Sequence, residues 1–272
     1  MLREEKTYIV RSMSEKRTLI EVRDLHSRFG AKKILKGVDI NLYAGETLVL
    51  LGGSGSGKSV LTKHMSGLLQ SDEGSIKVSG REIRELGERA LGEVRKQMGI
   101  MFQNGALFDS MTVGQNVAFP LIERGEKDQK VIEERVSKAL EIVALEGEED
   151  KMPSSLSGGM RKRVALARAI VDEPEVVIYD EPHAGLDPIT ADVIDHLIKG
   201  LQENHGITNV VITHELRSVF RIATRIAFLK DGKIYWQGTR AELKASDDPI
   251  LTKFLTGTSE AGIWEDEESR SF

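Results

Sequence analysis

The chain has 272 residues, no cysteine and a formal net charge of −5. Its length suits one large domain, or one domain with a subdomain, and the lack of cysteine excludes disulfides, cysteine-bound zinc and cysteine-held iron–sulfur clusters. The acidic balance argues against a general attraction to nucleic acid, and no apolar run reaches the roughly 18 to 20 residues of a membrane span. If the protein works at a membrane, a partner therefore holds it there.

The N-terminal region predicts a small group of antiparallel strands. Residues 1–18 read as a polar extension, and a first strand is expected at 19–22, where apolar and polar residues alternate. The same alternation recurs at 38–42, and another short strand is expected at 75–78. Phe29 lies between the first two strands, directly before a turn.

A glycine-rich turn follows the apolar run at 47–51 and precedes an expected helix over 60–69. The turn reads G-x-x-x-x-G-K-S, in the strand-to-helix context in which this motif binds phosphates. Its glycines let successive N–H groups point into one concavity, toward which the helix directs its positive end. Lys58 would reach the β- and γ-phosphates, and the Ser59 hydroxyl would bind Mg²⁺, so a nucleoside triphosphate site is expected. Its expected contact residues are Gly52, Gly53, Ser54, Gly55, Ser56, Gly57, Lys58, Ser59 and Val60.

The middle of the chain, from about 104 to 165, has the spacing of helices. A stripe of apolar residues along one helix face is expected there. It consists of Ile132, Val136, Ala139, Leu140 and Val143. A Pro-Ser-Ser stretch at 153–155 interrupts the pattern, and a second, basic helix is expected over 161–171. Together with the strands on either side, this segment predicts an α/β core with parallel strands and an inserted helical subdomain.

Two adjacent carboxylates end the next apolar strand, expected over 175–179. Asp180 and Glu181 come at its C-terminal end, where ligands lie in α/β sheets. Asp180 would hold Mg²⁺ through its water shell, and Glu181 could polarise the water that attacks the γ-phosphate. Taken alone, the pair would fit a simple acidic strand-to-loop transition, but the phosphate loop earlier in the chain favours the catalytic interpretation.

The remaining elements continue the α/β pattern. A helix is expected over 188–204 and a strand over 209–213, and His214 is expected to open a further helix. Two short apolar stretches at 226–229 and 233–237, joined by Asp-Gly, then predict a closing hairpin.

A serine and two glycines precede the basic helix. The Ser157 hydroxyl and the N–H groups of Gly158 and Gly159 stand at a helix start, where they can donate to a phosphate. In isolation this pattern would indicate a simple N-cap. Placed after a phosphate loop and before an Asp-Glu strand, it resembles the signature of the ATP-binding-cassette (ABC) family, and the resemblance covers about residues 19–245.

The ABC resemblance implies a fold. It implies an α/β, P-loop NTPase core of the RecA-like type, with an antiparallel β subdomain and an inserted α-helical signature subdomain. The cassette would span residues 19–257, with the helical subdomain at about 104–165, and an acidic tail would follow at 258–272.

The same resemblance implies roles for further residues. Phe29 sits where the family has an aromatic ring stacked on adenine; the alternative is a core phenylalanine. Gln103 would touch Mg²⁺ and lie at the joint with the helical subdomain. Asp187 belongs to a loop that contacts the opposite subunit, and His214 would sense the γ-phosphate.

Three positions depart from the family pattern. Met160 replaces the usual glutamine, His183 stands where threonine or serine is common, and Gly53 replaces a frequent proline. None of them removes a phosphate ligand or a carboxylate, so ATP hydrolysis is still expected.

The resemblance also implies a dimer of two copies placed head to tail. ATP held by Lys58 and Ser59 of one copy would be covered by Ser157 and Gly159 of the other. Binding of two ATP molecules would close the dimer, and hydrolysis would reopen it. The helical subdomain, moving with Gln103, would transmit closure to a partner.

Three further stretches, at 102–108, 116–121 and 185–190, are similar to those of the MlaF group of ABC ATPases. This implies a motor subunit that moves phospholipid between the inner and outer membranes of a Gram-negative bacterium. An integral membrane permease would dock in the groove after Gln103, and an Mce-domain lipid-binding protein and a small accessory protein would complete the complex. The chain would lie peripherally on the cytoplasmic face of the inner membrane.

Other classes stay open at this point. Importers of amino acids or other small solutes share the general motifs, but they usually carry glutamine at the Met160 position. A soluble cassette ATPase without a membrane partner, such as one serving iron–sulfur assembly, would lack a docking surface after Gln103. A non-hydrolysing regulatory module is disfavoured because Glu181 and His214 are both present.

The acidic tail over 260–272 carries Trp264 and Phe272 among its carboxylates. It is interpreted either as a solvated tail or as an anchor on the partner ATPase subunit, in which case it would contribute to dimerisation.

Overall fold

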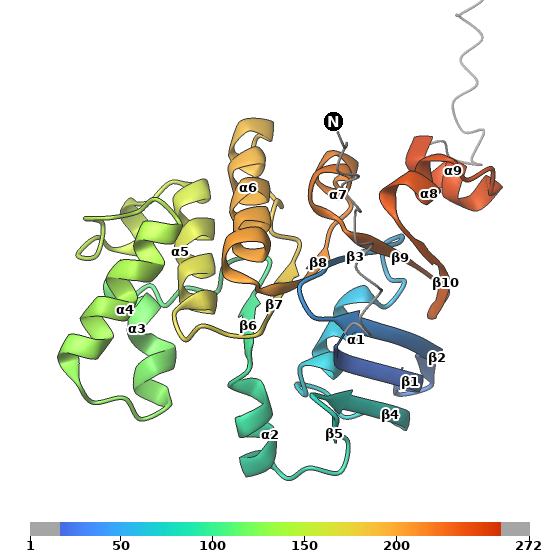
Figure 1. The fold of residues 1–272 in the computed structure, drawn as a ribbon, viewed down its shortest axis with the longest axis horizontal. Helices are drawn as coiled ribbons and strands as arrows, with labels where there is room; N and C mark the ends of the chain where they lie inside the picture. Colours follow the sequence, from blue (N-terminus) through green and yellow to red (C-terminus); the bar gives the residue numbers. More distant parts are fainter. Residues whose placement is uncertain (1–16, 257–272) are drawn as a thin grey trace, which may run out of the picture.

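The computed structural model describes residues 17–256 and shows two β-sheets with helices packed around them (Figure 1). The smaller sheet is antiparallel, with the strand order β2-β1-β4-β5. Its strands are β1 (Thr18–Phe29), β2 (Lys32–Tyr43), β4 (Glu73–Val78) and β5 (Arg81–Glu82). The strands β1 and β2 are longer than their alternating sequence stretches indicate, because shifts in their mutual register interrupt the period-two pattern.

The larger sheet carries the parallel core, with the strand order β10-β9-β3-β8-β7-β6. Only β10 runs antiparallel to its neighbour; it closes the hairpin with β9 that the sequence predicts. The strands are β3 (Thr47–Leu51), β6 (Met98–Met101), β7 (Val176–Asp180), β8 (Thr208–Ile212), β9 (Arg225–Lys230) and β10 (Lys233–Gly238). All residues of β3 and β8 are buried, as expected for central strands covered on both faces.

This sheet separates two hydrophobic cores. Val49 and Leu51 of β3 point into one core, whereas Leu48 and Leu50 point into the other, because successive side chains of a strand face opposite sides. The first core also contains the buried residues of the middle helices, and the second contains those of the antiparallel sheet. The α/β fold expected from the sequence is therefore confirmed.

The helices differ in where they lie. Figure 1 shows α3, α4 and α5 grouped at one end of the molecule, with α6 between this group and α7. The helices are α1 (Lys58–Met65), α2 (Glu88–Arg95), α3 (Val113–Glu123), α4 (Gln129–Ile142), α5 (Gly158–Ile170), α6 (Pro188–His205), α7 (Leu216–Ile222), α8 (Arg240–Lys244) and α9 (Pro249–Thr256). Within residues 17–256, no helix combines the length and the apolar content needed to cross a bilayer.

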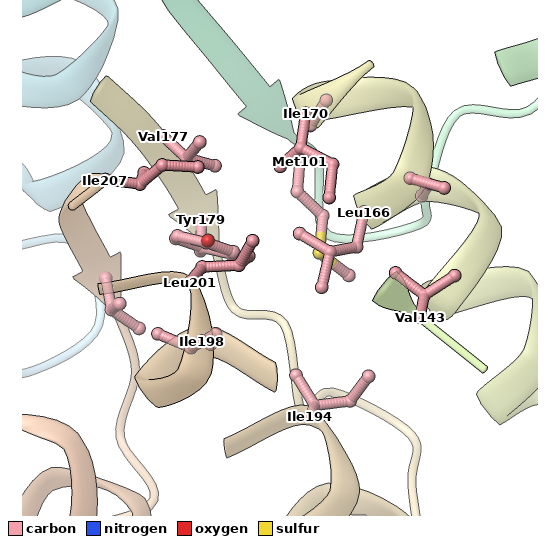
Figure 2. Packing of buried hydrophobic residues seen from close by; sticks show 14 of the residues in the cluster. Met101, Val143, Leu166, Ile170, Val177, Tyr179, Ile194, Ile198, Leu201 and Ile207 are labelled. Carbon is pink, nitrogen blue, oxygen red and sulfur yellow. The ribbon is translucent and has the colours of Figure 1, made fainter. Parts of the chain in front are cut away.

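The helical group is joined to the sheet by one continuous core (Figure 2). The stripe predicted for α4 is buried along its length, with exposed fractions of 0% at Val143 and 6% at Ile132. The same cluster contains Leu166 of α5, Met101 of β6 and Tyr179 of β7, which Figure 2 shows in one layer. Apolar periodicity therefore identified this helix and its buried face correctly.

The sequence analysis does not predict three of the helices in the described part of the chain. Each places few residues in a core: Leu91 and Val94 from α2, Leu243 from α8 and Leu251 from α9. These helices have 8, 5 and 8 residues, so each pattern is too short to identify a helix from periodicity.

Two helix boundaries also differ from expectation. The helix after the glycine-rich turn spans Lys58–Met65 rather than 60–69, because the chain turns at Gly67, whose φ is 68°. The expectation that His214 opens α7 is wrong by two residues, since the helix begins at Leu216. The reason is local: the Thr213 hydroxyl accepts the N–H of Glu215 at 3.1 Å, which forms a turn before the helix.

Some expectations fall outside the described residues. These include most of the N-terminal extension and the tail residues Trp264 and Phe272. Thr18, which was assigned to the extension, already belongs to β1. The division of the chain into extension, cassette and tail stays a prediction.

Candidate functional site

The glycine-rich loop connects β3 to α1, and its backbone requires glycine. Gly57, the N-cap of α1, has a φ of 109°, a conformation that other residues rarely adopt. A Cβ atom on Gly52 would lie 2.1 Å from the Leu229 carbonyl oxygen, so no side chain fits there. The loop is thereby held tightly between the sheet and the helix start.

The polar groups of this loop are arranged for an anion. The Ser56 hydroxyl is buried and has no hydrogen-bond partner among residues 17–256, so an additional ligand would satisfy it. The Lys58 ammonium donates to the carbonyl oxygens of Gly52 at 2.8 Å and Gly53 at 3.0 Å. Burial lowers the pKa of Lys58, and the carboxylates of Glu181 and Asp180 partly offset this shift. A cation and helix N–H groups thus converge on one loop, as phosphate binding requires.

The start of α1 and the end of β7 meet at a hydroxyl–carboxylate pair. The Ser59 hydroxyl donates to Asp180 Oδ1 at 3.1 Å, although the two residues are 121 positions apart. Such oxygen ligands suit Mg²⁺, which retains several waters and takes few groups from the protein. The described residues contain no group of three or more His, Asp or Glu side chains placed to hold a metal ion.

A carboxylate and an imidazole lie beside this pair. Glu181 Oε2 is 2.9 Å from His214 Nδ1, and the Glu181 side chain is only 17% exposed. Glu181 has a φ of 47°, in the left-handed region that is unfavourable for a residue with a long side chain. Its N–H donates to the Ile212 carbonyl oxygen at 2.9 Å, which holds this conformation. Backbone strain held in this way is a common feature of functional sites.

The strand register explains why these residues converge. Leu50 of β3 lies opposite Ile212 of β8, and Ile212 lies opposite Asp180 of β7. Because these strands are parallel, the residues that follow each of them reach the same edge of the sheet. The phosphate loop, Glu181 and His214 therefore share one edge.

Phe29 and Gln103 lie at the margins of the site. Phe29 ends β1 with 54% of its surface exposed, so the alternative of a core phenylalanine is wrong. Gln103 is exposed two residues after β6, and its carbonyl oxygen accepts from the Lys162 ammonium. In the described part of the chain, the Gln103 side chain makes no hydrogen bond to Ser59 or Asp180, so its Mg²⁺ contact stays a prediction.

The second glycine-containing turn lies away from the phosphate loop. Ser157 is the N-cap of α5 and its hydroxyl accepts the N–H of Met160 at 3.2 Å. A Cβ on Gly159 would lie 2.4 Å from Thr190 Cγ2, so glycine is required where α5 approaches α6. Figure 1 shows α5 on the far side of α6 and the sheet from α1. One chain therefore does not bring the two predicted phosphate-binding turns together.

Asp187 has a structural function within its own chain. Its carboxylate caps α6 by accepting the N–H groups of Ile189 and Thr190, each at 3.0 Å, and the Thr190 hydroxyl at 2.5 Å. The hydroxyl and backbone donors lower the pKa of Asp187. The predicted contact of this loop with an opposite subunit is not tested by a single chain.

Sequence reasoning missed two buried polar features beside the site. Lys162 is 7% exposed, and burial lowers its pKa. His183 and Asp195 form a buried contact between the loop after β7 and α6. The unusual histidine at 183 was the one signal in the sequence that could have pointed to the second feature.

The fold and these contacts define a P-loop nucleoside triphosphatase. The glycine-rich loop, the Ser59–Asp180 contact and the Glu181 carboxylate lie together at one edge of the parallel sheet, as in such enzymes.

Comparison with known proteins identifies the family. The sequence profile described as ABC transporter matches residues 35–184, and the chain belongs to this family. It is an ATPase that binds and hydrolyses ATP.

Several named proteins are similar over most of the chain. TRIGALACTOSYLDIACYLGLYCEROL 3 of Arabidopsis thaliana is 41% identical, over 90% of this chain and 75% of that protein. The intermembrane phospholipid transport system ATP-binding protein MlaF of Haemophilus influenzae is 39% identical, over 90% and 93%. The probable ribonucleotide transport ATP-binding protein mkl of Mycobacterium leprae is 40% identical, over 88% and 69%.

Solved ABC structures share the fold. The dimeric cassette MJ0796 bound to ADP and Pi has a TM-score of 0.75 and 30% identity, covering 81% of this chain and 98% of its own. The protein cbiO1 from Clostridium perfringens, part of a cbiONQ transporter complex, has a TM-score of 0.79 and 32% identity, covering 88% and 96%.

Proposed function

We propose that two copies of this chain form a head-to-tail dimer with two composite ATP sites. The observation that carries this proposal is the separation of the phosphate loop from the turn at Ser157–Gly159 within one chain. An open phosphate loop leaves part of the bound triphosphate uncovered, and a second anion-binding helix start in a partner copy would complete the site. Dimeric structures of the related cassette MJ0796 support this arrangement.

The residues at this edge of the sheet have separate roles in ATP hydrolysis. Lys58 neutralises charge on the β- and γ-phosphates, and Ser59 and Asp180 would hold Mg²⁺, which neutralises further charge when bound. Glu181 accepts a proton from the water that attacks the γ-phosphate. His214, in contact with the Glu181 carboxylate, orients it and responds to the γ-phosphate.

Phe29 provides a stacking surface for the adenine ring. It stands exposed at the end of β1, where an aromatic face is available to a flat ligand. Gln103 lies between the site and the helical group, where it would report the presence of the nucleotide to a membrane partner.

Replacing Phe29 by alanine is expected to weaken ATP binding. Loss of one base–aromatic stacking contact costs about 1–3 kcal/mol, so ATP affinity should fall roughly 5- to 150-fold. Isothermal titration of the isolated subunit with ATP measures the effect. Tyr235→Ala, another aromatic with 43% exposure, is the matched control and should bind ATP normally. Equal affinity in the Phe29→Ala protein would show that the adenine lies elsewhere.

The cargo we propose is phospholipid. MlaF of Haemophilus influenzae is named for intermembrane phospholipid transport, and the match to this chain covers 93% of its length. The mycobacterial relatives are named for ribonucleotide transport instead, so cargo needs a direct test. A permease would dock in the groove after Gln103, where Phe108 is 40% exposed and offers an apolar contact. An Mce-type lipid-binding protein and a small accessory protein would complete a complex on the cytoplasmic face of the inner membrane.

Purification of the complex from membranes tests the cargo. The chain is expressed with its neighbouring membrane genes, and co-purifying molecules are identified by mass spectrometry, with Glu181→Gln as the trapped control. Enriched phospholipid, together with ATPase activity that the control lacks, is the expected result. A membrane complex that carries nucleotides or amino acids but no lipid would show that the cargo is not phospholipid. A soluble complex without lipid would also contradict the proposal of phospholipid transport.

A further inference from the structure

His183 is a buried histidine that connects three segments around the ATPase site. It lies two residues after Glu181, and its side chain is 5% exposed. Its neighbours are Asp195 of α6, whose side chain is 2% exposed, and Thr213, which is fully buried before His214. The mechanism outlined above does not use His183.

Both ring nitrogens of His183 have a polar neighbour. Nε2 lies 2.8 Å from Asp195 Oδ1, in a close polar contact that lacks the alignment of a hydrogen bond, and Nδ1 lies 3.4 Å from the Thr213 hydroxyl. Because the Thr213 oxygen already accepts the N–H of Glu215, its own proton is free to point toward Nδ1. The ring therefore lies between the Asp195 carboxylate and the Thr213 hydroxyl.

A cavity adjoins the buried ring. A cavity of about 430 Å³ borders His183 and Asp195 between α6 and α7. The second Asp195 oxygen, Oδ2, lies 3.4 Å from an Arg221 guanidinium nitrogen, and Arg221 also pairs with Asp192. Arg221 therefore contacts the Asp195 carboxylate through the oxygen that does not face the ring.

The residues in contact with His183 are close in the chain to the proposed catalytic groups. Thr213 is bonded to His214, which contacts the Glu181 carboxylate. The His183 carbonyl oxygen accepts the N–H of Leu186 at 3.1 Å, within the loop that leads to Asp187. The ring therefore ties α6 to both loops that deliver Glu181 and His214.

We propose that His183 is a positioning residue for ATP hydrolysis, which fixes Thr213 and His214 relative to Glu181 through its contact with Asp195. This inference rests on the proposed roles of Glu181 and His214. His183 reaches no part of the phosphate loop through these contacts, so its loss should affect the chemical step more than ATP binding. A small displacement of a catalytic group is enough to slow a reaction strongly.

The test compares two substitutions of His183 in the purified subunit or complex. His183→Phe keeps the ring but removes both polar contacts, and it should lower kcat by about tenfold, because misplacement of a catalytic group costs up to a hundredfold. The Kd for ATP should stay unchanged. His183→Gln retains an N–H donor near the Nε2 position, and its kcat should recover to within roughly threefold of the unchanged protein. His205→Phe, on the exposed end of α6, is the matched control with unchanged kcat.

A purely structural role would give a different pattern. If His183 only stabilised the fold, His183→Phe would lower the melting temperature and the fraction of active protein. It would not lower kcat while leaving the Kd for ATP unchanged, and His183→Gln would not restore kcat. Equal kcat in His183→Phe and the unchanged protein would also overturn the inference.

A second variant covers the case in which His183→Phe fails to fold. Thr213→Val removes the hydroxyl that faces Nδ1 of His183 while His183 stays in place, and it should lower kcat without changing the Kd for ATP. Equal kcat in Thr213→Val and the unchanged protein would overturn the inference. Glu181→Gln is assayed in parallel: if it retains ATPase activity, the proposed catalytic role of Glu181 fails, whereas an inactive Glu181→Gln with a fully active His183→Phe removes the His183 inference alone.

Discussion

Replacing Glu181 by glutamine is expected to lower kcat for ATP hydrolysis by about 10²- to 10⁴-fold, the range for loss of a positioned general base. The amide retains the size and shape of the carboxylate but cannot accept the proton of the attacking water. ATP should still bind, because the groups placed toward the phosphates lie in the glycine-rich loop and the first turn of α1. The measurement is steady-state phosphate release, together with ATP binding to the same preparation.

The Glu181→Gln protein should also accumulate as the ATP-bound dimer, since the hydrolysis that reopens the dimer is blocked. Size-exclusion chromatography with ATP and Mg²⁺ would detect this shift. Glu203→Gln makes the same change on α6, where Glu203 lies 3.6 Å from Lys199 in an exposed ion pair, and it should behave like the unchanged protein. Retention of more than about a tenth of the activity in Glu181→Gln is incompatible with a general base.

Replacing Ser157 by arginine should abolish ATPase activity while leaving ATP binding to the separate subunit intact. The reason is that α5, whose N-cap is Ser157, lies across α6 and the sheet from α1 (Figure 1). A bulky cation at the start of α5 would block the contact with ATP bound to the other copy. The expected loss is at least about 10²-fold, comparable to removal of electrostatic groups that act in the transition state.

Mixing two inactive proteins tests the composite site directly. Lys58→Ala should bind ATP poorly, because the cation of the phosphate loop is lost. In a mixed dimer with Ser157→Arg, one site contains both defects and the other contains neither, so activity should partly return. The control is Lys58→Ala/Ser157→Arg in one chain mixed with itself, which should stay inactive. If the two single variants show no recovery when mixed, head-to-tail composite sites are excluded.

Local patterns in the sequence predicted much of the site, because they express requirements of the backbone. The glycines at 52 and 57 were assigned to a phosphate loop, and both occupy positions where a side chain would clash or where φ is positive. The stripe on α4 was assigned from its spacing, and the structure buries it. By contrast, α2, α8 and α9 are too short for periodicity to reveal them.

Contacts between distant segments depend on the order and register of the strands. The sequence predicts Mg²⁺ ligands at Ser59 and at Asp180 from two separate local motifs, and the sheet brings the two side chains to 3.1 Å. The register of β3, β8 and β7 produces this contact, and no local pattern encodes the order of strands in a sheet.

The sequence by itself determined that this protein has a phosphate loop, an α/β core and the motifs of an ABC ATPase, because short-range spacing specifies turns, caps and buried faces. Only the tertiary structure decided that α5, whose N-cap is Ser157, lies across α6 and the sheet from α1, that Phe29 is exposed, and that His183 contacts Asp195 inside the protein. These features arise from the packing of elements that are distant in the chain. Such packing is settled by which surfaces become buried together when the whole domain folds.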